Sequence, residues 1–345
     1  MIAQKEITII TPTYNSIRTL NEYMKAIIKQ DYPHNNISVI FVDGGSNDGT
    51  LECIKKYSDE VDFSIEVYKN SLKTAEAGKA LGAKKAKGEI VCLLDSDNII
   101  PDSNWLSLMV KPFEDVNIIA SEPIKYTYQK SDSVVDRYCA LIGMNDPLCL
   151  FIGNYDRYCT ITDKWTNVDR EEINMGDYLS VKFSSKIIPT IGANGFFMRK
   201  KELLDNIEGD YLFDIDILFE VLKNNSSLRV AKVDTGIIHL FCPDIKTFIR
   251  KQNRRIKDYL YFSDKKARKY PWSKINKIKI VLFILSCLTI VPLLVQVIVG
   301  CCRKSDIKAW AFHVIACWIT LILYGWGVIT GVFHKSEANR DGWKQ

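Results

Sequence analysis

The sequence predicts an α/β protein, in which a mainly parallel sheet with covering helices is followed by two apolar helices near the C-terminus. Short apolar runs rich in β-branched residues alternate with helical segments in the first part of the chain, as in βαβ units. Two later stretches, residues 280–300 and 310–333, contain no charged residue. Each is long enough to cross a hydrocarbon core of ~30 Å. The mean hydropathy of −0.05 and the 25% of charged residues therefore average two unlike parts, and they exclude a disordered or collagen-like chain.

The first part of the chain is expected to contain four strands and three helices. The strands are Ile7–Ile10, Ser38–Val42, Ser64–Tyr68 and Ile90–Leu94, and the helices are Ser16–Gln30, Thr50–Tyr57 and Ala75–Lys87. Polar clusters follow three of the strands, at Thr11–Asn15, Asp43–Thr50 and Asp95–Asn98. Because ligands of such sheets bind beyond the carboxyl ends of the strands, we expect a binding site at this edge.

The hydropathy pattern is less regular from Ser121 to Pro189, and regular elements return after it. We expect an apolar helix at Leu212–Lys223, strands at Leu228–Lys232 and Gly236–Leu240, and a long basic helix at Asp244–Phe262. That helix leads toward the apolar C-terminal part.

The C-terminal part is expected to be a transmembrane hairpin. A basic juxtamembrane segment, residues 263–279, precedes transmembrane helices at 280–300 and 310–333. The positive-inside rule places the basic flank in the cytoplasm, where it can also contact anionic headgroups. Since no signal peptide opens the chain, we expect a multi-pass protein of the cell membrane with a cytoplasmic soluble part. The alternative is a buried helical hairpin in a soluble core. A nucleic-acid partner is not expected, because a membrane accounts for the basic run.

The sequence Asp95-Ser96-Asp97 follows an apolar strand and indicates a metal site. Two carboxylates this close repel each other unless a cation lies between them. Mg²⁺ or Mn²⁺ is the expected ion, with its other positions filled by water and substrate phosphates. The alternative is a solvated turn or a helix N-cap.

The glycine-rich segment Asp43–Thr50 lets the backbone approach a ligand, and Asp43 can accept hydrogen bonds from a base or ribose. A dinucleotide site is the rival interpretation. That site needs a GxGxxG sequence after the first strand, whereas this strand ends in Thr-Pro-Thr-Tyr-Asn. The nicotinamide interpretation is therefore weakened.

The combination of these motifs resembles the family 2 glycosyltransferases, which have the Rossmann-like GT-A fold. The motifs are, in order, Thr11-Pro-Thr-Tyr-Asn15, Val42-Asp-Gly-Gly-Ser-Asn-Asp-Gly-Thr50, Gly78-Lys79-Ala80, Ala86-Lys-Gly-Glu89 and Leu94-Asp-Ser-Asp-Asn98. The resemblance resumes at Gly192-Ala-Asn-Gly195 and extends through Asp214 to Arg255, so it covers most of the soluble chain.

The resemblance implies that residues 1–120 form a nucleotide-sugar-binding half and residues 121–262 an acceptor half. The donor would be a nucleotide-diphosphate sugar of the UDP or GDP type. Its nucleotide would be surrounded by Thr11, Pro12, Thr13, Tyr14 and Asp43, with Asp43 near the base.

The resemblance also implies the residues around the diphosphate. Lys79 would lie near the nucleotide or diphosphate; the alternative is a solvated helix lysine. Asp95 would approach the ribose or the metal, and Asp97 would bind the metal. His239 would be a further metal or phosphate contact, although a histidine after a strand is also often structural.

Family members that glycosylate hydroxyls carry a Glu-Asp pair before a helix, and the aspartate acts as the base. Phe213-Asp214-Ile215-Asp216 stands in that place here, so Asp214 aligns with the base and the preceding glutamate is missing. Asp216 is the second candidate. The alternative is a carboxylate that favours the helix dipole.

The segment Gln252-Asn-Arg-Arg255-Ile256 resembles the Gln-x-x-Arg-Trp motif of processive relatives, with Ile256 in place of tryptophan. This difference and the two expected membrane helices argue against a polymer-extruding synthase. Arg254 or Arg255 would contact the diphosphate or an acceptor phosphate.

The resemblance therefore implies a membrane-anchored, metal-dependent, inverting glycosyltransferase that acts on a lipid-linked acceptor at the cytoplasmic face. The first expectation is transfer to a sugar hydroxyl of a lipid-linked or surface glycan precursor, because a candidate base is present. The alternative is transfer to polyprenyl phosphate, as in relatives of dolichyl-phosphate mannose synthase. A catalytically silent membrane scaffold and a membrane-bound nicotinamide enzyme are hypotheses of other classes.

Overall fold

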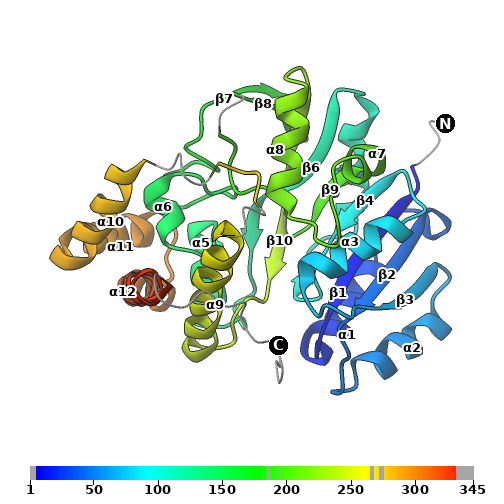
Figure 1. Ribbon diagram of the computed structural model, residues 1–345, viewed down its shortest axis with the longest axis horizontal. Coiled ribbons are helices and arrows are strands. Elements are labelled where there is room, and N and C mark those ends of the chain that lie inside the picture. The colour runs from blue at the N-terminus through cyan, green and yellow to red at the C-terminus, as the bar shows by residue number, and fades with distance from the viewer. Residues whose placement is uncertain (1–4, 185–186, 193, 265–267, 272–275, 332–345) are drawn as a thin grey trace. The chain divides into compact units, whose positions relative to one another are not determined.

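The computed structural model describes residues 5–184, 187–192, 194–264, 268–271 and 276–331 (Figure 1). The chain forms two compact units. Of the described residues, those between 5 and 124 and between 169 and 239 form the first unit, and those between 125 and 168 and between 240 and 331 form the second. Each unit is thus built from segments that are far apart in the sequence, whereas the expected halves were continuous.

The first unit is built on a ten-stranded sheet with the order β3-β2-β1-β4-β9-β6-β10-β8-β7, in which β5 also pairs with β10. The first four strands, β1 (Ile7–Thr13), β2 (Ile37–Asp43), β3 (Ser64–Lys69) and β4 (Ile90–Leu93), are parallel to their neighbours. β9 (Phe196–Arg199) pairs antiparallel to β4. The predicted α/β class is therefore confirmed, and the parallel part of the sheet is its N-terminal part.

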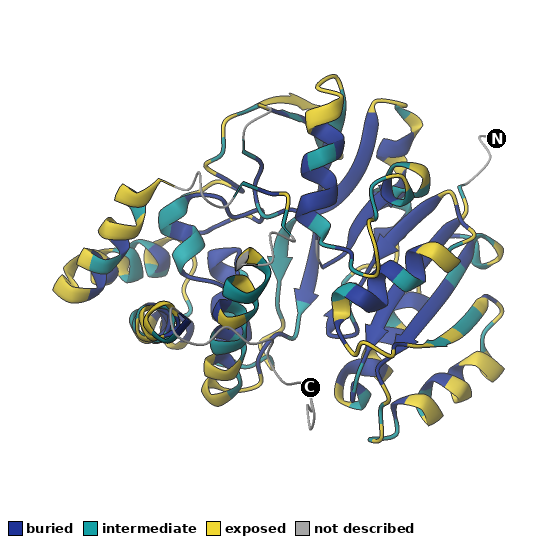
Figure 2. Ribbon diagram, viewed as in Figure 1, coloured by how far each residue is buried: buried dark blue, intermediate teal, exposed yellow. Residues whose placement is uncertain are grey.

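The parallel strands are joined by helices α1 (Ile17–Ile28), α2 (Thr50–Glu60) and α3 (Ala75–Lys85). The chain runs from β1 to β2 to β3 in one direction across the sheet and then back past β1 to β4. Because parallel crossovers are right-handed, α3 therefore lies on the opposite face of the sheet from α1 and α2. All seven residues of β1 are buried, as the dark strands of Figure 2 show. A Cβ at Gly82 would lie 2.4 Å from Ile10 Cγ2, so this glycine lets α3 pack closely on β1.

The later strands form antiparallel pairs, β6 with β9, β10 with β5 and with β8, and β8 with β7. They are β5 (Asn98–Ile99), β6 (Ile118–Thr127), β7 (Arg170–Asn174), β8 (Tyr178–Phe183) and β10 (Arg229–His239), and the helices beside them are α4 (Trp105–Val110), α7 (Lys200–Leu204) and α8 (Asp214–Asn224). The two strands expected at 228–232 and 236–240 are one continuous strand, β10. Gly236 lies within this strand, and its carbonyl accepts a hydrogen bond from the buried Trp105 indole at 2.8 Å.

The second unit is helical. It contains α5 (Val134–Ile142), α6 (Leu148–Ile152), α9 (Ile245–Asp264), α10 (Lys277–Thr289), α11 (Val291–Arg303) and α12 (Ile307–Gly331). Phe312 of α12 packs edge-on against Tyr138 of α5 and Phe248 of α9. A Cβ at Gly327 would lie 2.8 Å from Ile256 Cγ1. Ile256, which replaces the tryptophan of the processive motif, is therefore part of the contact between α9 and α12.

The expected transmembrane helix 280–300 is wrong as a single helix. It is broken into α10 and α11, which meet at an angle of 90°. Ile290 at the break has φ +61°, and Pro292 lies in the first turn of α11. Proline lacks the N–H that a continuous helix would need there, so it favours a break. The expected juxtamembrane segment includes residues 265–267 and 272–275, which lie outside the described residues.

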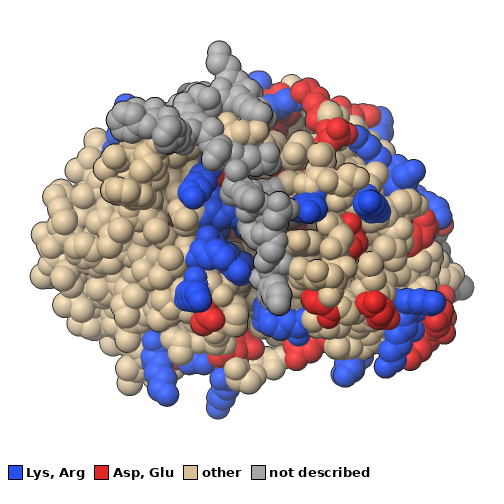
Figure 3. Space-filling view, turned by 60° about the horizontal axis from the view of Figure 1, so that its bottom comes forward, with Lys and Arg blue, Asp and Glu red and all other residues tan. Residues whose placement is uncertain are grey.

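Among the described residues, α12 alone is long and apolar enough to span a membrane, and α10 with α11 would add a second span only as a broken one. The two-helix hairpin is therefore not supported. Large apolar side chains are exposed on all three helices, including Ile278, Val291 and Trp326. Figure 3 shows a broad area over the C-terminal helices that is made up almost entirely of residues other than Lys, Arg, Asp and Glu.

Candidate active site

The Asp95–Asp97 turn is held between two parts of the sheet. Asp95 follows β4 after one residue, and Asn98 begins β5, which pairs with the end of β10 in the register Asn98 to His239. The backbone N–H of Asn98 donates to the carbonyl of Asp95 at 2.9 Å. A motif that is local in the sequence is thereby brought beside His239, more than a hundred residues later.

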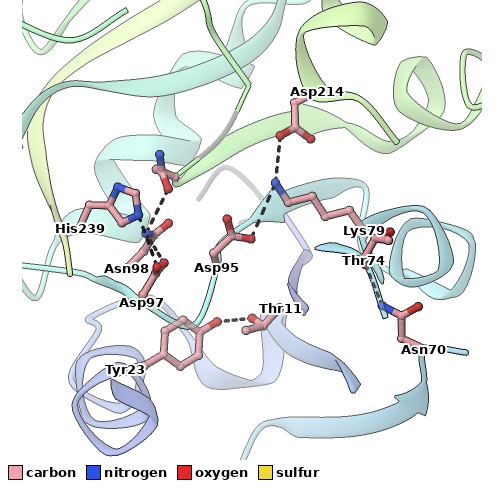
Figure 4. A network of polar contacts seen from close by, with 11 residues as sticks. Thr11, Tyr23, Asn70, Thr74, Lys79, Asp95, Asp97, Asn98, Asp214 and His239 are labelled. Atoms are coloured by element: carbon pink, nitrogen blue, oxygen red, sulfur yellow. Dashed lines mark hydrogen bonds and ion pairs between the residues drawn. The ribbon is translucent and has the colours of Figure 1, made fainter. Parts of the chain in front are cut away.

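Asp97 and His239 face each other across this turn, as Figure 4 shows. His239 Nε2 lies 3.5 Å from Asp97 Oδ2, and each side chain is 10% exposed. Asn98 Nδ2 donates to Asp97 Oδ1 at 3.1 Å and also to Asn194 Oδ1 at 3.2 Å. Asn98 and Asn194 lie within the quoted motifs Leu94–Asn98 and Gly192–Gly195, but neither was among the expected site residues.

Asp95 turns the other way, toward Lys79. Lys79 Nζ lies 3.7 Å from Asp95 Oδ1 and 2.9 Å from Asp214 Oδ2. The lysine side chain is 6% exposed, so the alternative of a solvated helix lysine does not hold. Lys79 thus joins the end of β4 to the first residue of α8 (Figure 4).

The local sequence explains how Lys79 reaches this position. Thr74 caps α3 by accepting a hydrogen bond from the Ala77 N–H at 3.0 Å. Asn70 Nδ2 donates to the Thr74 carbonyl at 2.8 Å, which fixes the chain before the cap. The start of the helix is therefore well defined, and Lys79 follows within its second turn.

Burial changes the proton affinity of this cluster. Burial raises the pKa of Asp214 to about 6, although Lys79 beside it acts in the opposite direction. Burial alone would lower the pKa of Lys79, but Asp214 and Asp95 together raise it above its usual value. Asp214 Oδ1 and Asp95 Oδ1 are buried and accept no hydrogen bond within the described part of the chain. Such buried, unsatisfied oxygens are unusual in a folded protein and suggest a place for a ligand.

The expected metal residues are divided between these two groups. The described residues include no cluster of three or more His, Cys, Asp or Glu side chains that could hold a metal ion. Asp97 and His239 form one pair. Asp95 belongs to the other group, beside Lys79, and its Oδ1 accepts no hydrogen bond from the described residues. Carboxylate oxygens with few protein ligands fit a divalent ion that keeps water and substrate phosphates as its other ligands.

The carboxylate of Asp43 is occupied by protein donors. Its Oδ1 accepts from the N–H groups of Gly45 and Ser46, at 2.8 and 2.9 Å. Its Oδ2 accepts from the hydroxyls of Thr13 and Ser46, at 3.1 and 2.5 Å. A carboxylate has about four such positions, so Asp43 holds the glycine-rich loop in place.

The other residues expected near a nucleotide differ in exposure. Thr11 and Pro12 are buried, and the Thr11 hydroxyl is hydrogen-bonded to Tyr23. Tyr14 is partly exposed, and a Cβ at Gly44 would lie 3.2 Å from its ring. Tyr14 is therefore the side chain of this group that is most open to a ligand.

Asp216 and the two arginines have other surroundings. Asp216 is 4% exposed, within α8. In the second unit, Arg255 Nη1 donates to the Asn145 carbonyl at 3.1 Å and to Gln252 Oε1 at 2.9 Å. Arg254 Nε lies 4.0 Å from Asp258 Oδ2 on the same helix.

The comparison with protein families decides the classification. The family model "Glycosyl transferase family 2" matches residues 8–208, which is more than half of the chain. The chain belongs to glycosyl transferase family 2. The expected family is thereby confirmed. The family 2 match includes Lys79, Asp95 and Asp97 and ends before Asp214 and His239.

Named relatives resemble this family 2 glycosyltransferase over part of its length. The glycosyltransferase AglE of Haloferax volcanii is 25% identical over 40% of this chain and 45% of its own. The poly(ribitol-phosphate) β-N-acetylglucosaminyltransferase TarS of Staphylococcus aureus is 31% identical over 27% of this chain and 16% of its own. The similarity thus covers less than half of either relative.

The structural comparison supports the fold. The mannosyltransferase PcManGT from Pyrobaculum calidifontis, solved with GDP-Man and Mn²⁺, matches 97% of this chain and 89% of its own, with a TM-score of 0.56 and 14% identity. At this identity the likeness concerns the fold alone. The expected GT-A fold of the family 2 glycosyltransferase is confirmed.

Proposed function

We propose that this family 2 glycosyltransferase transfers a sugar, with inversion, from a nucleotide-diphosphate sugar to a hydroxyl of a lipid-linked or surface glycan precursor. The observation that carries the proposal is the cluster of Lys79, Asp95 and Asp214 at the carboxyl end of β4, with two carboxylate oxygens that are buried and unsatisfied. PcManGT, which shares the fold, was solved with GDP-Man, and the name of TarS states a sugar transfer to poly(ribitol-phosphate).

Asp214 is proposed as the general base. Its Oδ2 is paired with Lys79, and its buried Oδ1 accepts no hydrogen bond from the described residues and would take the hydroxyl proton. A carboxylate with a pKa of about 6 is a stronger base than an ordinary aspartate and is still ionised near pH 7. The acceptor oxygen would attack the anomeric carbon while its proton moves to Asp214, and the nucleoside diphosphate would leave from the opposite face. Asp216 remains the second candidate.

Lys79 is proposed to bind the diphosphate of the donor. In the described structure its charge is shared between Asp95 and Asp214. A bound diphosphate would compete for the same ammonium group. Donor binding would therefore weaken the Lys79–Asp214 pair, so that Asp214 could accept a proton more readily. Asp97 and His239, with Asp95, would hold the divalent cation, Mg²⁺ or Mn²⁺. When bound, this ion neutralises negative charge on the leaving diphosphate.

The remaining expectations complete the proposal. Thr13, Tyr14 and Asp43 would form the nucleotide end of the site, through the loop that Asp43 holds. Residues 1–120 would bind the donor, and residues 121–262, including Arg254 and Arg255, would serve the acceptor. The exposed apolar residues of α10, α11 and α12 would hold the protein at the cytoplasmic face of the membrane.

One observation favours transfer to polyprenyl phosphate as the second candidate. Lys79 pairs with Asp214, and a lysine in this position reduces the basicity of the carboxylate. A phosphate acceptor is already anionic and needs little base catalysis, so it would tolerate this arrangement.

The proposal is tested with the full chain in membranes. Nucleotide sugars are screened with a lipid extract, and the products are analysed by mass spectrometry, which identifies donor and acceptor together. Asp214→Asn is compared with Asp210→Asn, since Asp210 is exposed and its partner is the surface residue Lys84. For a hydroxyl acceptor, we expect Asp214→Asn to lower kcat by about 10²–10⁴-fold and Asp210→Asn to leave it unchanged. Near-wild-type turnover of Asp214→Asn would exclude the hydroxyl acceptor and leave polyprenyl phosphate.

A further inference from the structure

A buried ion pair lies in the sheet of the first unit, outside the residues discussed so far. Glu122 is on β6 and Lys232 is on β10, and these strands are neighbours in the sheet. Lys232 Nζ lies 2.7 Å from Glu122 Oε2, and both side chains are completely buried. Removing two charges from water is costly, and apolar residues of similar size often serve stability at least as well. A contribution to stability is therefore a weak explanation for this pair.

The second oxygen of Glu122 supports the segment that follows residue 190. Glu122 Oε1 accepts a hydrogen bond from the Gly192 N–H at 3.2 Å. Gly192 has φ +131°, and a Cβ at this position would lie 2.4 Å from the Cβ of Asp214. The Gly192 backbone therefore lies directly against the start of α8, where Asp214 is the first residue.

The same segment continues to the other side of the site. Asn194, with φ +59°, accepts a hydrogen bond from Asn98, which also donates to Asp97. The Gly195 N–H then donates to the Leu93 carbonyl at 3.0 Å, at the end of β4. Gly192, Asn194 and Gly195 thus join the surroundings of Asp214 to those of Asp97.

We infer that Glu122 and Lys232 are positioning residues for Asp214. Lys232 holds the carboxylate of Glu122, Glu122 holds the Gly192 N–H, and the Gly192 backbone fixes the Asp214 side chain and shields it from water. The inference rests on the proposed function for its catalytic consequence. A displacement of about 1 Å at a reacting group can cost about 10²-fold in rate, so a support in the core of the sheet has a functional effect.

Two double variants separate positioning from stability. Glu122→Gln with Lys232→Met removes both charges and keeps an oxygen that can accept from Gly192. Glu122→Leu with Lys232→Met removes both charges and that oxygen. Both variants avoid an unpaired buried charge. Thermal unfolding and nucleotide binding of the full chain in detergent show that each one is folded.

The first readout does not depend on activity. The full chain is treated at one fixed pH with a carbodiimide and an amine, and labelling of Asp214 is followed by mass spectrometry. We expect the Gln/Met variant to label at the wild-type rate and the Leu/Met variant to label at least about tenfold faster. Equal labelling of the two folded variants would overturn the inference.

The second readout is kinetic. We expect the Leu/Met variant to lose about 10²-fold in kcat with an unchanged KM for the donor, and the Gln/Met variant to stay within about threefold of the wild type. If labelling separates the variants and kcat does not, then the positioning stands and the base role of Asp214 fails.

Gly192→Ala tests the same contact without changing the ion pair, in case the Leu/Met variant does not fold. Its Cβ would collide with Asp214, so we expect faster labelling of Asp214 and a similar loss of kcat. Wild-type labelling and wild-type kcat in Gly192→Ala would also overturn the inference.

Discussion

The two units each contain a cluster of buried charged groups, and the clusters differ in how completely their carboxylates are hydrogen-bonded. In the first unit, Lys79 bridges Asp95 and Asp214, and one oxygen of each carboxylate accepts no hydrogen bond from the described residues. In the second unit, Arg255 donates to the Asn145 carbonyl and to Gln252. Tyr324 of α12 donates to Asp146 Oδ2 at 2.6 Å and to Gln252 Oε1 at 3.1 Å.

This difference distinguishes a ligand-binding site from a cluster that only connects helices. The second cluster ties α9 and α12 to the turn before α6. Both oxygens of its Asp146 carboxylate accept hydrogen bonds, and the buried oxygen of this cluster that accepts none from the described residues is the neutral amide oxygen of Asn145. The first cluster instead leaves carboxylate oxygens without a donor among the described residues, at an energetic cost to the unliganded protein. Charge and burial alone would not have distinguished the two clusters, and the carboxylate oxygens without a hydrogen bond do.

The largest expected effect comes from removing the bridge in the first cluster. Lys79→Met leaves two neighbouring carboxylates without their cation, so we expect kcat to fall by about 10³-fold and stability by about 3–5 kcal/mol. Lys84→Met is the matched control, because Lys84 is on the same helix and its side chain is 44% exposed. Initial rates and thermal unfolding are measured for both variants. Equal rates in the two variants would show that the first cluster is only structural.

The next effect is the pH dependence of the first cluster. Since folding raises the pKa of Asp214 from 3.8 to about 6, the native state binds this proton more tightly than the unfolded state. This contribution favours the folded state below pH 3.8 and is lost as the pH rises to about 6. The base is needed ionised, so we expect kcat/KM, which reports the unliganded enzyme, to fall about tenfold for each pH unit below pH 6. This decrease below pH 6 should remain in Asp210→Asn and should be absent from the residual activity of Asp214→Asn.

The membrane contact of the second unit gives a smaller effect. Ile322 of α12 is 58% exposed, and a lysine in the middle of a membrane helix costs about 2.5–3.5 kcal/mol. We expect Ile322→Lys to move part of the protein from the membrane to the soluble fraction. Val116→Lys, at a position that is 79% exposed in the first unit, should not change the distribution. An unchanged distribution of Ile322→Lys would refute α12 as the membrane contact.

The smallest effect is expected in the second cluster. Tyr324→Phe removes a hydroxyl whose single proton lies between the Asp146 carboxylate and Gln252, and it should cost about 1.5–3 kcal/mol. We expect a lower unfolding temperature and a change in kcat of less than about threefold. Tyr259→Phe on α9, where the tyrosine is 38% exposed, is the control. A large loss of kcat in Tyr324→Phe at unchanged stability would contradict the distinction between the clusters.

Local patterns predicted the parts of this protein that depend on local physics. The alternation of short apolar strands and helices identified β1 to β4 and the edge where Asp43, Asp95 and Asp97 gather, because parallel strands end at one edge. The uncharged stretch after residue 310 identified α12. The break between α10 and α11 was missed, because a proline in an apolar stretch is compatible with either a kinked span or two helices.

The amino-acid sequence by itself determined the family, the sheet class and the residue types at the end of β4. The tertiary structure alone decided how those residues are partnered. It paired Lys79 with Asp214 and Asp97 with His239, and it placed the Glu122–Lys232 ion pair beside the Gly192 N–H. The physical reason is that an ion pair depends on distances of a few ångströms, and residues separated by more than a hundred positions reach such distances only through the sheet.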